Sequence, residues 1–121
     1  MNVSYHGQGA NYSEAVLVDD RIYLSGLVAE DLETGDLKLG TIEEETELVM
    51  QNMKTILEKY GSSMDKLIRV EIFMTDFSER VRMNQVYASH FDPAHIPSRV
   101  CVGCTDLYEG CRVEMLAIAH R

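Results

Sequence analysis

The chain has 121 residues, of which 45% are hydrophobic and 26% are charged, and its formal net charge is −9 at pH 7. This length suits a single domain over residues 1–121, and the composition excludes a disordered or fibrous chain. The acidic balance and the scattered Lys and Arg residues exclude a phosphate-binding track, so we expect no nucleic acid as a partner.

The first predicted elements are two short strands joined by an acidic turn. Residues 15–18 and 21–28 are rich in β-branched and aromatic side chains, and Asp19-Asp20 separates them, which is typical of a β-hairpin. Residues 30–40 contain two glycines and several acidic residues, so we expect a surface loop there.

A long helix and a strand follow. Thr41 and Glu44 have the spacing of a capping box, and apolar residues then recur at helical intervals until Gly61. This pattern predicts a helix over 41–60. Residues 66–75 alternate between two faces and are rich in Ile, Val and Phe, which predicts a strand.

The last third predicts one more helix and two more strands. Asp76 is placed to cap a helix with Glu79 in its first turn, and an apolar stripe continues to Phe91. Apolar strands are expected over 97–102 and 111–119.

The predicted order of elements is ββαβαββ, which indicates an α+β fold with a mixed β-sheet and two helices on one face. Two helices cover only one face of such a sheet, yet the last strands are apolar on both faces. We therefore expect the second face to pack against further copies of the chain.

Two charged residues interrupt the final apolar strands, and buried charges are rarely left unpaired. Arg99 and Glu114 therefore predict a small site that holds a carboxylate and handles a water. If the two strands formed a hairpin with Cys104 opposite Cys111, Glu114 would lie opposite Cys101. Arg99 would then be a diagonal neighbour of Glu114 on the same face.

The chain resembles the RidA (YjgF-like) enamine/imine deaminases along nearly its whole length. Each matching motif is weak alone, but their order and spacing are specific. The motifs are Asn11-Tyr12-Ser13-Glu14-Ala15-Val16, Ile22-Tyr23-Leu24-Ser25-Gly26, Asn52, Val70-Glu71-Ile72-Phe73-Met74-Thr75-Asp76, Asn84-Gln85-Val86-Tyr87, Pro97-Ser98-Arg99-Val100-Cys101-Val102 and Val113-Glu114-Met115-Leu116-Ala117-Ile118-Ala119.

The resemblance implies a chorismate-mutase-like fold that assembles as a homotrimer, with a site in each cleft between subunits. It implies hydrolysis of short 2-imino acids and their enamines to 2-keto acids and ammonia, the 2-iminobutanoate/2-iminopropanoate deaminase reaction, with no cofactor and no metal. Arg99 would hold the substrate carboxylate, and Glu114 would position or activate the attacking water. The pocket would be lined by Tyr12, Ser25, Asn84 and the backbone around Cys101.

Three positions depart from the family pattern. Asn11 stands where many members have Pro, Leu27 where Gln is common, and Tyr108 where Pro often follows the leucine of the last turn. None of them removes an implied functional residue. They indicate a branch with a different pocket shape and a different preferred substrate.

Other interpretations of the same residues stay open. Arg99 could form only a structural ion pair, and Glu114 could be merely the partner of Arg99 or Arg112. The trimer could bind metabolites without catalysis or act in the manner of a chaperone. Ribonuclease activity is disfavoured because the chain is acidic.

The cysteines give weak signals only. Cys101-Val102-Gly103-Cys104 with Cys111 is a poor zinc pattern, because residues three apart on a strand point to opposite faces. An odd number favours reduced thiols, although the assumed hairpin would let Cys104 and Cys111 pair. With no membrane-length apolar run and no signal-peptide pattern over residues 1–6, we expect a cytoplasmic protein without a membrane partner.

Overall fold

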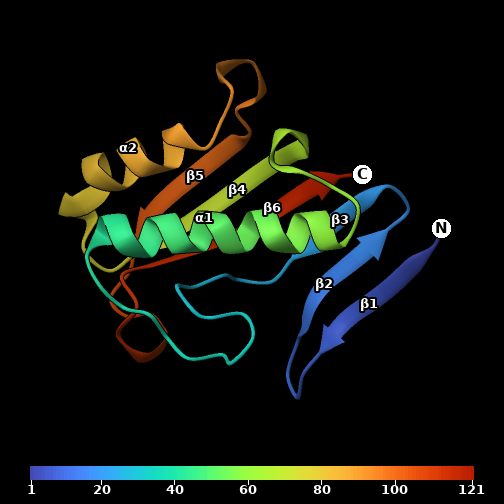
Figure 1. Cartoon of the computed structure of the whole chain (residues 1–121), viewed down its shortest axis with the longest axis horizontal. Helices are drawn as coiled ribbons and strands as arrows, with labels where there is room; N and C mark the ends of the chain where they lie inside the picture. The colour runs from blue at the N-terminus through green and yellow to red at the C-terminus, as the bar shows by residue number, and fades with distance from the viewer.

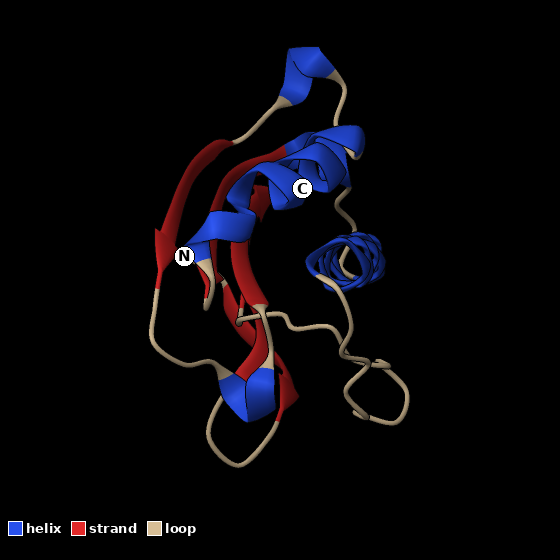
Figure 2. Cartoon of the chain, turned by 90° about the vertical axis from the view of Figure 1, so that its left-hand side faces the viewer, coloured by secondary structure: helices blue, strands red, loops and turns tan.

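The computed structural model describes all 121 residues as one six-stranded sheet with two helices on one face (Figures 1 and 2). The strand order is β1-β2-β3-β6-β4-β5. The elements are β1 (Val3–Gln8), β2 (Ser13–Val18), β3 (Arg21–Leu24), α1 (Ile42–Lys59), β4 (Leu67–Met74), α2 (Arg80–Ser89), β5 (Ser98–Gly103) and β6 (Val113–His120). The predicted α+β class, the mixed sheet and the placement of both helices on one face are confirmed.

The core lies between the helices and one face of the sheet. On β6, alternate residues from Val113 to Ala119 are buried, and the residues between them face away from the helices. The long helix α1 begins at a complete capping box, in which Thr41 accepts from the Glu44 N–H and the Glu44 side chain accepts from the Thr41 N–H. The predicted first helix is therefore confirmed within a residue at each end.

The final two strands do not form the predicted hairpin. β4 pairs with β5 in parallel and with β6 in antiparallel, so it lies between them. The physical reason is the β4–α2–β5 unit, because a strand–helix–strand connection places its two strands side by side and parallel. β6 then takes the other edge of β4, and residues 104–112 cross the end of that strand.

This order of strands changes the register of the predicted site. Glu114 pairs with Phe73 of β4, so the expected pairing of Glu114 with Cys101 is wrong. Cys101 pairs instead with Ile72. The register that would have joined Cys104 to Cys111 does not exist, and all three cysteines are free.

One additional strand and two boundaries also differ from expectation. Strand β1 was not predicted, and it adds an edge strand beside β2. Helix α2 begins at Arg80 and not at Asp76, because Asp76 caps a separate 3₁₀ turn over Phe77–Glu79 by accepting from the Ser78 N–H. The second predicted strand also ends early, at Leu24, and Leu27 then makes an isolated bridge to Met115.

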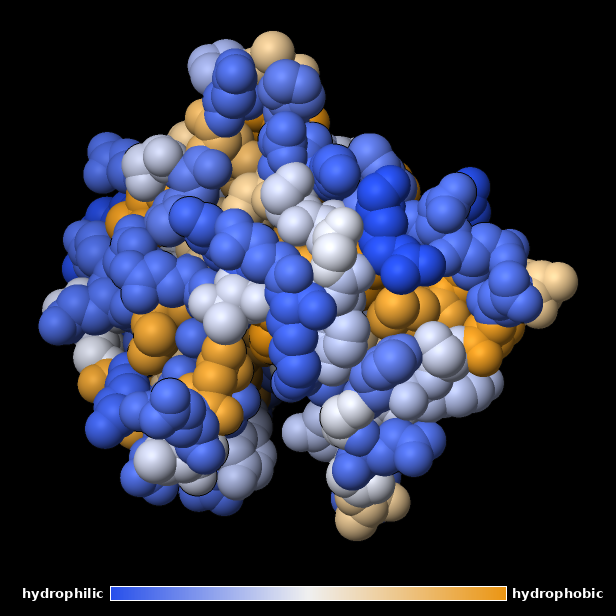
Figure 3. All heavy atoms as spheres, turned by 45° about the vertical axis from the view of Figure 1, so that its right-hand side comes forward, coloured by the Kyte–Doolittle hydropathy of each residue, from blue (hydrophilic) through white to orange (hydrophobic).

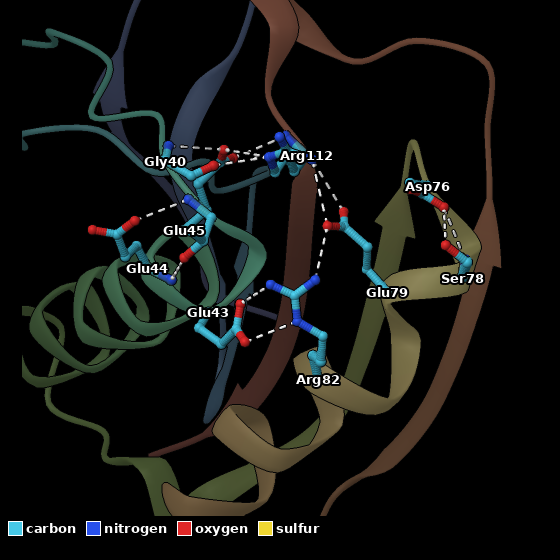
Figure 4. A network of polar contacts seen from close by, with 10 residues as sticks. Gly40, Glu43, Glu44, Glu45, Asp76, Ser78, Glu79, Arg82 and Arg112 are labelled. Atoms are coloured by element: carbon cyan, nitrogen blue, oxygen red, sulfur yellow. Dashed lines mark hydrogen bonds and ion pairs between the residues drawn. The ribbon is translucent and has the colours of Figure 1, made fainter.

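A polar network fixes the start of β6 (Figure 4). The buried Glu45 carboxylate accepts hydrogen bonds from the Arg112 N–H at 2.9 Å and the Gly40 N–H at 3.3 Å. The Arg112 guanidinium donates to the Gly40 carbonyl at 2.8 Å and pairs with Glu79 at 3.2 Å. Helix α1, the turn before α2 and strand β6 are therefore joined two residues before Glu114.

The face of the sheet away from the helices is largely apolar. Tyr5, Tyr23, Val100 and Val102 are between 37% and 61% exposed there. Phe73 and Leu116 lie between them on β4 and β6 and are half-buried. The Arg69–Glu71 ion pair of β4 interrupts this face, and a mainly apolar surface of this kind is typical of a subunit interface. Neither α1 nor α2 has the length and hydropathy required of a membrane-crossing helix.

Candidate functional site

A cavity of about 510 Å³ opens where β6 begins, beside the segment that follows β3. The space-filling view shows the molecule hollowed between the β1–β2 turn and the loop that precedes α1 (Figure 3). Its size is within the range of small-molecule sites. The cavity is lined by Tyr12, Ser25, Gly26, Val28, Glu30, Gly35, Tyr108 and Glu114.

Glu114 is the central acidic group of this cavity. Its carboxylate lies against the backbone of Gly26, where an added Cβ would meet Oε2 at 2.0 Å, so a larger residue at position 26 would displace the carboxylate from this position. The carboxylate has no hydrogen-bond or ion-pair partner in the chain, and burial raises its pKa above the ordinary value of 4.5. An unpaired carboxyl with a raised pKa is a stronger base than an ordinary glutamate and is suited to accepting and returning a proton.

Tyr12 and Ser25, which the family resemblance implies as pocket residues, line the same cavity as Glu114. The Ser25 hydroxyl donates to the Ser13 carbonyl at 2.5 Å, which holds it against β2. The Tyr12 side chain is 69% exposed at the rim. These two residues and Glu114 are three of the six predicted site residues, and the fold brings them together.

Arg99 lies elsewhere, in a second hollow of about 250 Å³ between β5 and α2. Its guanidinium donates to the Asn84 side-chain oxygen at 2.7 Å and lies over the Tyr87 ring, with Cζ 4.9 Å from the ring centroid. It makes no ion pair within the chain. An exposed arginine that is oriented by a neutral amide and an aromatic ring is free to bind an external anion.

Cys101 lies on the same face of β5 as Arg99 but lines neither cavity. Burial raises the pKa of its thiol, while Arg99 and Arg80 act in the opposite direction. Its sulfur lies 3.8 Å from the Met74 sulfur. The thiol is therefore placed behind the arginine and against the core.

The predicted residues thus form two separate groups in one protomer. Tyr12, Ser25 and Glu114 share the larger cavity, whereas Asn84 and Arg99 share the smaller one. Arg99 and Glu114 do not form an ion pair with each other in the chain. Arg112, the other possible partner of Glu114, pairs with Glu45 and Glu79.

Two functional-group side chains of the larger cavity, those of Tyr108 and Glu30, were not assigned to a site from the sequence. Tyr108 was noted only as a departure from the family pattern, and Glu30 only as part of an acidic loop. The sequence did contain one signal for Glu30: in an extended chain successive side chains point to opposite sides, so Val28 and Glu30 lie on the same side. No three His, Cys, Asp or Glu side chains are grouped as a metal site would require.

Comparison with known proteins is consistent across sequence and structure. Residues 7–121 match the family model described as endoribonuclease L-PSP. A RutC family protein of Pyrococcus abyssi is 36% identical over 91% of this chain and 86% of its own length. The human 2-iminobutanoate/2-iminopropanoate deaminase is 32% identical over 89% of this chain and 78% of its own length.

The fold agrees with solved structures of the same group. The crystal structure of yeast Mmf1 superposes with a TM-score of 0.88 at 34% identity, covering all of this chain and 98% of the other. The relatives carry different names, which include RutC, endoribonuclease and deaminase. The match over residues 7–121 and the shared fold together show that this chain belongs to the YjgF/RidA family.

Proposed function

We propose that this protein hydrolyses short 2-imino acids and their enamine tautomers to 2-keto acids and ammonia. The observation that carries the proposal is the pair of unsatisfied charged groups: Arg99 has no anionic partner, and Glu114 has no partner at all in its cavity. A 2-imino acid offers a carboxylate for the first group and an electrophilic carbon, with an attacking water, for the second. The names of the deaminase relatives point to the same substrate class.

The complete site requires two copies of the chain, because the two groups lie in different hollows of one protomer. We propose a homotrimer in which the apolar faces of the sheets meet and each cleft pairs Arg99 and Asn84 of one copy with the Glu114 cavity of its neighbour. Tyr12 and Ser25 would line the cleft on the Glu114 side. The backbone at Cys101 would line it on the Arg99 side.

The reaction needs one group that first accepts a proton from water and then donates it to the substrate nitrogen, and Glu114 is proposed for both steps. The Arg99 guanidinium holds the substrate carboxylate through two N–H groups and orients the imine carbon. Glu114 takes a proton from water as the water oxygen bonds to that carbon, and the C=N bond becomes a C–N single bond. Glu114 returns the proton to the nitrogen. Glu114 then takes the hydroxyl proton and passes it to the nitrogen as the C–N bond breaks, so ammonia and the keto acid leave and Glu114 is ionised again.

The proposal is tested with imines made in place by an L-amino acid oxidase, with semicarbazide capturing any imine that has not yet been hydrolysed. Wild-type protein should lower the amount of imine that semicarbazide captures, because it hydrolyses the imine first. Arg99→Ala should lower kcat/KM by about 10² or more, because a charged bidentate contact is lost. Lys54→Ala removes an exposed charge on α1, away from both hollows, and serves as the control.

Two outcomes would contradict the proposal. One is no effect of the wild-type protein on any small imine. The other is full activity in Arg99→Ala with an unchanged fold. Keto acid binding without turnover, measured by calorimetry, would favour the second candidate, a metabolite-binding trimer that uses the same cleft.

A further inference from the structure

A second carboxyl group, that of Glu30, faces the cavity that contains Glu114. Along the extended segment after β3, Leu27 and Ala29 are buried in the core, while Val28 and Glu30 line the cavity. Because side chains alternate along extended chain, this pattern directs Glu30 to the cavity side. Glu30 belongs to the proposed substrate cleft and not to the remote acidic surface.

The backbone that carries Glu30 is held rigidly. The Asn52 amide of α1, only 5% exposed, donates to the Glu30 carbonyl at 2.9 Å and to the Val28 carbonyl at 3.4 Å. Lys38 donates its backbone N–H to the Ala29 carbonyl at 2.8 Å, and Glu30 bridges to Leu37. Such a clamp fixes the direction of a side chain before any ligand arrives, which favours selective binding.

The Glu30 carboxylate has no structural role within the chain. It makes no hydrogen bond or ion pair, whereas the buried Glu45 carboxylate is fully engaged by Arg112 and Gly40. Burial raises the pKa of Glu30, and no cation nearby offsets this. A half-buried carboxylate without a hydrogen-bond or ion-pair partner destabilises the folded chain, and such groups are typical of ligand-binding sites.

The cavity is consequently acidic. Its lining contains two carboxyl groups and no Lys, Arg or His. Burial raises the pKa of the nearby Cys111 thiol, and the charges of Glu45, Glu114 and Glu30 raise it further, which places both cavity carboxylates within electrostatic range of one buried group. The rings of Tyr12 and Tyr108 complete the lining with faces that attract cations.

We propose that Glu30 is a specificity-determining residue that selects imino acids whose side chain ends in a positive charge. This inference rests on the proposed function: Arg99 of a neighbouring copy holds the substrate carboxylate, Glu114 acts at the imine carbon, and Glu30 receives the cationic end of the substrate. A cavity of about 510 Å³ has room for such a side chain. Acidic side chains are rejected by the same two carboxylates.

The test compares imines made by a broad-specificity L-amino acid oxidase from arginine, citrulline and leucine. Arginine and citrulline have side chains of equal length and differ in charge, so the ratio of their kcat/KM values isolates the charge. Wild-type protein should prefer the arginine imine by about tenfold, the order expected for one charge-assisted contact. Glu30→Gln should bring the ratio near one, and the arginine imine should lose about tenfold more than the leucine imine.

Glu33→Gln is the matched control, because Glu33 is exposed in the same loop and its side chain makes no hydrogen bond or ion pair. The Glu33→Gln variant should have the same ratio of kcat/KM for the arginine and citrulline imines as wild-type protein. Thermal unfolding of each variant reports whether Glu30→Gln retains its fold, and Glu30→Val repeats the test with a different side chain.

The two proposals fail in different ways. If the leucine imine is accelerated but the wild-type arginine-to-citrulline ratio is near one, the role of Glu30 is wrong and the deaminase assignment stands. An equal loss on all three imines in Glu30→Gln would also overturn the specificity role. If no imine is accelerated by wild-type protein, the deaminase assignment fails and the role of Glu30 fails with it.

Discussion

Arg99 and Glu114 project from opposite faces of the same sheet. Arg99 of β5 and Ala117 of β6 both pair with Val70 of β4, on the face that the helices cover. Glu114 precedes Ala117 by three residues, so its side chain points to the other face. A single protomer cannot direct both groups at one small substrate, and any chemistry that needs both must use two copies.

The raised pKa of Glu114 predicts a pH dependence of activity. Glu114 must be ionised to take a proton from water, so kcat/KM should fall as pH drops through the raised pKa, at a higher pH than for an ordinary glutamate. A pH–rate profile of the wild-type protein checks this. An acid limb at or below the ordinary glutamate pKa would argue against Glu114 as the base.

The same shift predicts that Glu114 lowers stability at neutral pH. A carboxyl whose pKa is higher in the folded than in the unfolded state binds more protons when folded. Its contribution to stability is present at low pH and is lost as pH rises through the interval between the two values. Glu114→Gln should therefore unfold at a higher denaturant concentration than wild type at pH 7, while losing activity. An unchanged or lower midpoint would contradict the burial argument.

Two substitutions of Tyr87 distinguish the role of its aromatic ring from the role of its hydroxyl. The residue is 4% exposed, its ring lies under the Arg99 guanidinium, and its hydroxyl has no hydrogen-bond partner. Tyr87→Phe should leave stability unchanged or raise it by about 1 kcal/mol, because an unsatisfied buried group is removed. Tyr87→Leu should raise KM, because the ring that orients Arg99 is lost. Denaturant unfolding and steady-state kinetics measure the two effects.

Glu45 should be the main polar determinant of stability near the cavity. Its carboxylate is fully buried and holds the Arg112 N–H and the Gly40 N–H. Glu45→Ala should lower the free energy of unfolding by about 3 kcal/mol, because both donors and the arginine lose their partner. Glu58→Ala, an exposed change on the same helix, is the control and should shift it by less than about 0.5 kcal/mol. Equal effects of the two changes would show that the network in Figure 4 contributes little.

Local patterns predicted most elements of this fold and the antiparallel hairpin of β2 and β3, but they did not predict how the last three strands pair. The capping box at Thr41 and the alternation of residues 66–75 are short-range signals, and the helix and the strand that they predicted are both present. The order of β4, β5 and β6 depends on contacts far apart in sequence, although the strand–helix–strand rule favoured parallel pairing of β4 with β5. Strand β1 was missed because Val3–Gln8 is largely polar and exposed.

The candidate site could be anticipated only in part for the same reason. Arg99 and Glu114 were chosen as candidates because each is a charge in an apolar strand, which is visible in the sequence. Their separation onto two faces follows from the strand order, which the sequence did not reveal. Glu30 could not be distinguished from its acidic neighbours, because its position depends on a clamp from Asn52 on a distant helix.

The most direct test of the central claim is complementation between two inactive variants. Arg99→Ala and Glu114→Ala are purified separately, then unfolded, mixed in equal amounts and refolded together. If each site takes Arg99 from one copy and Glu114 from another, random assembly restores both groups in about a quarter of the sites. The mixture should then regain about a quarter of wild-type imine hydrolysis, and a mixture no more active than either variant alone would contradict a site shared between subunits.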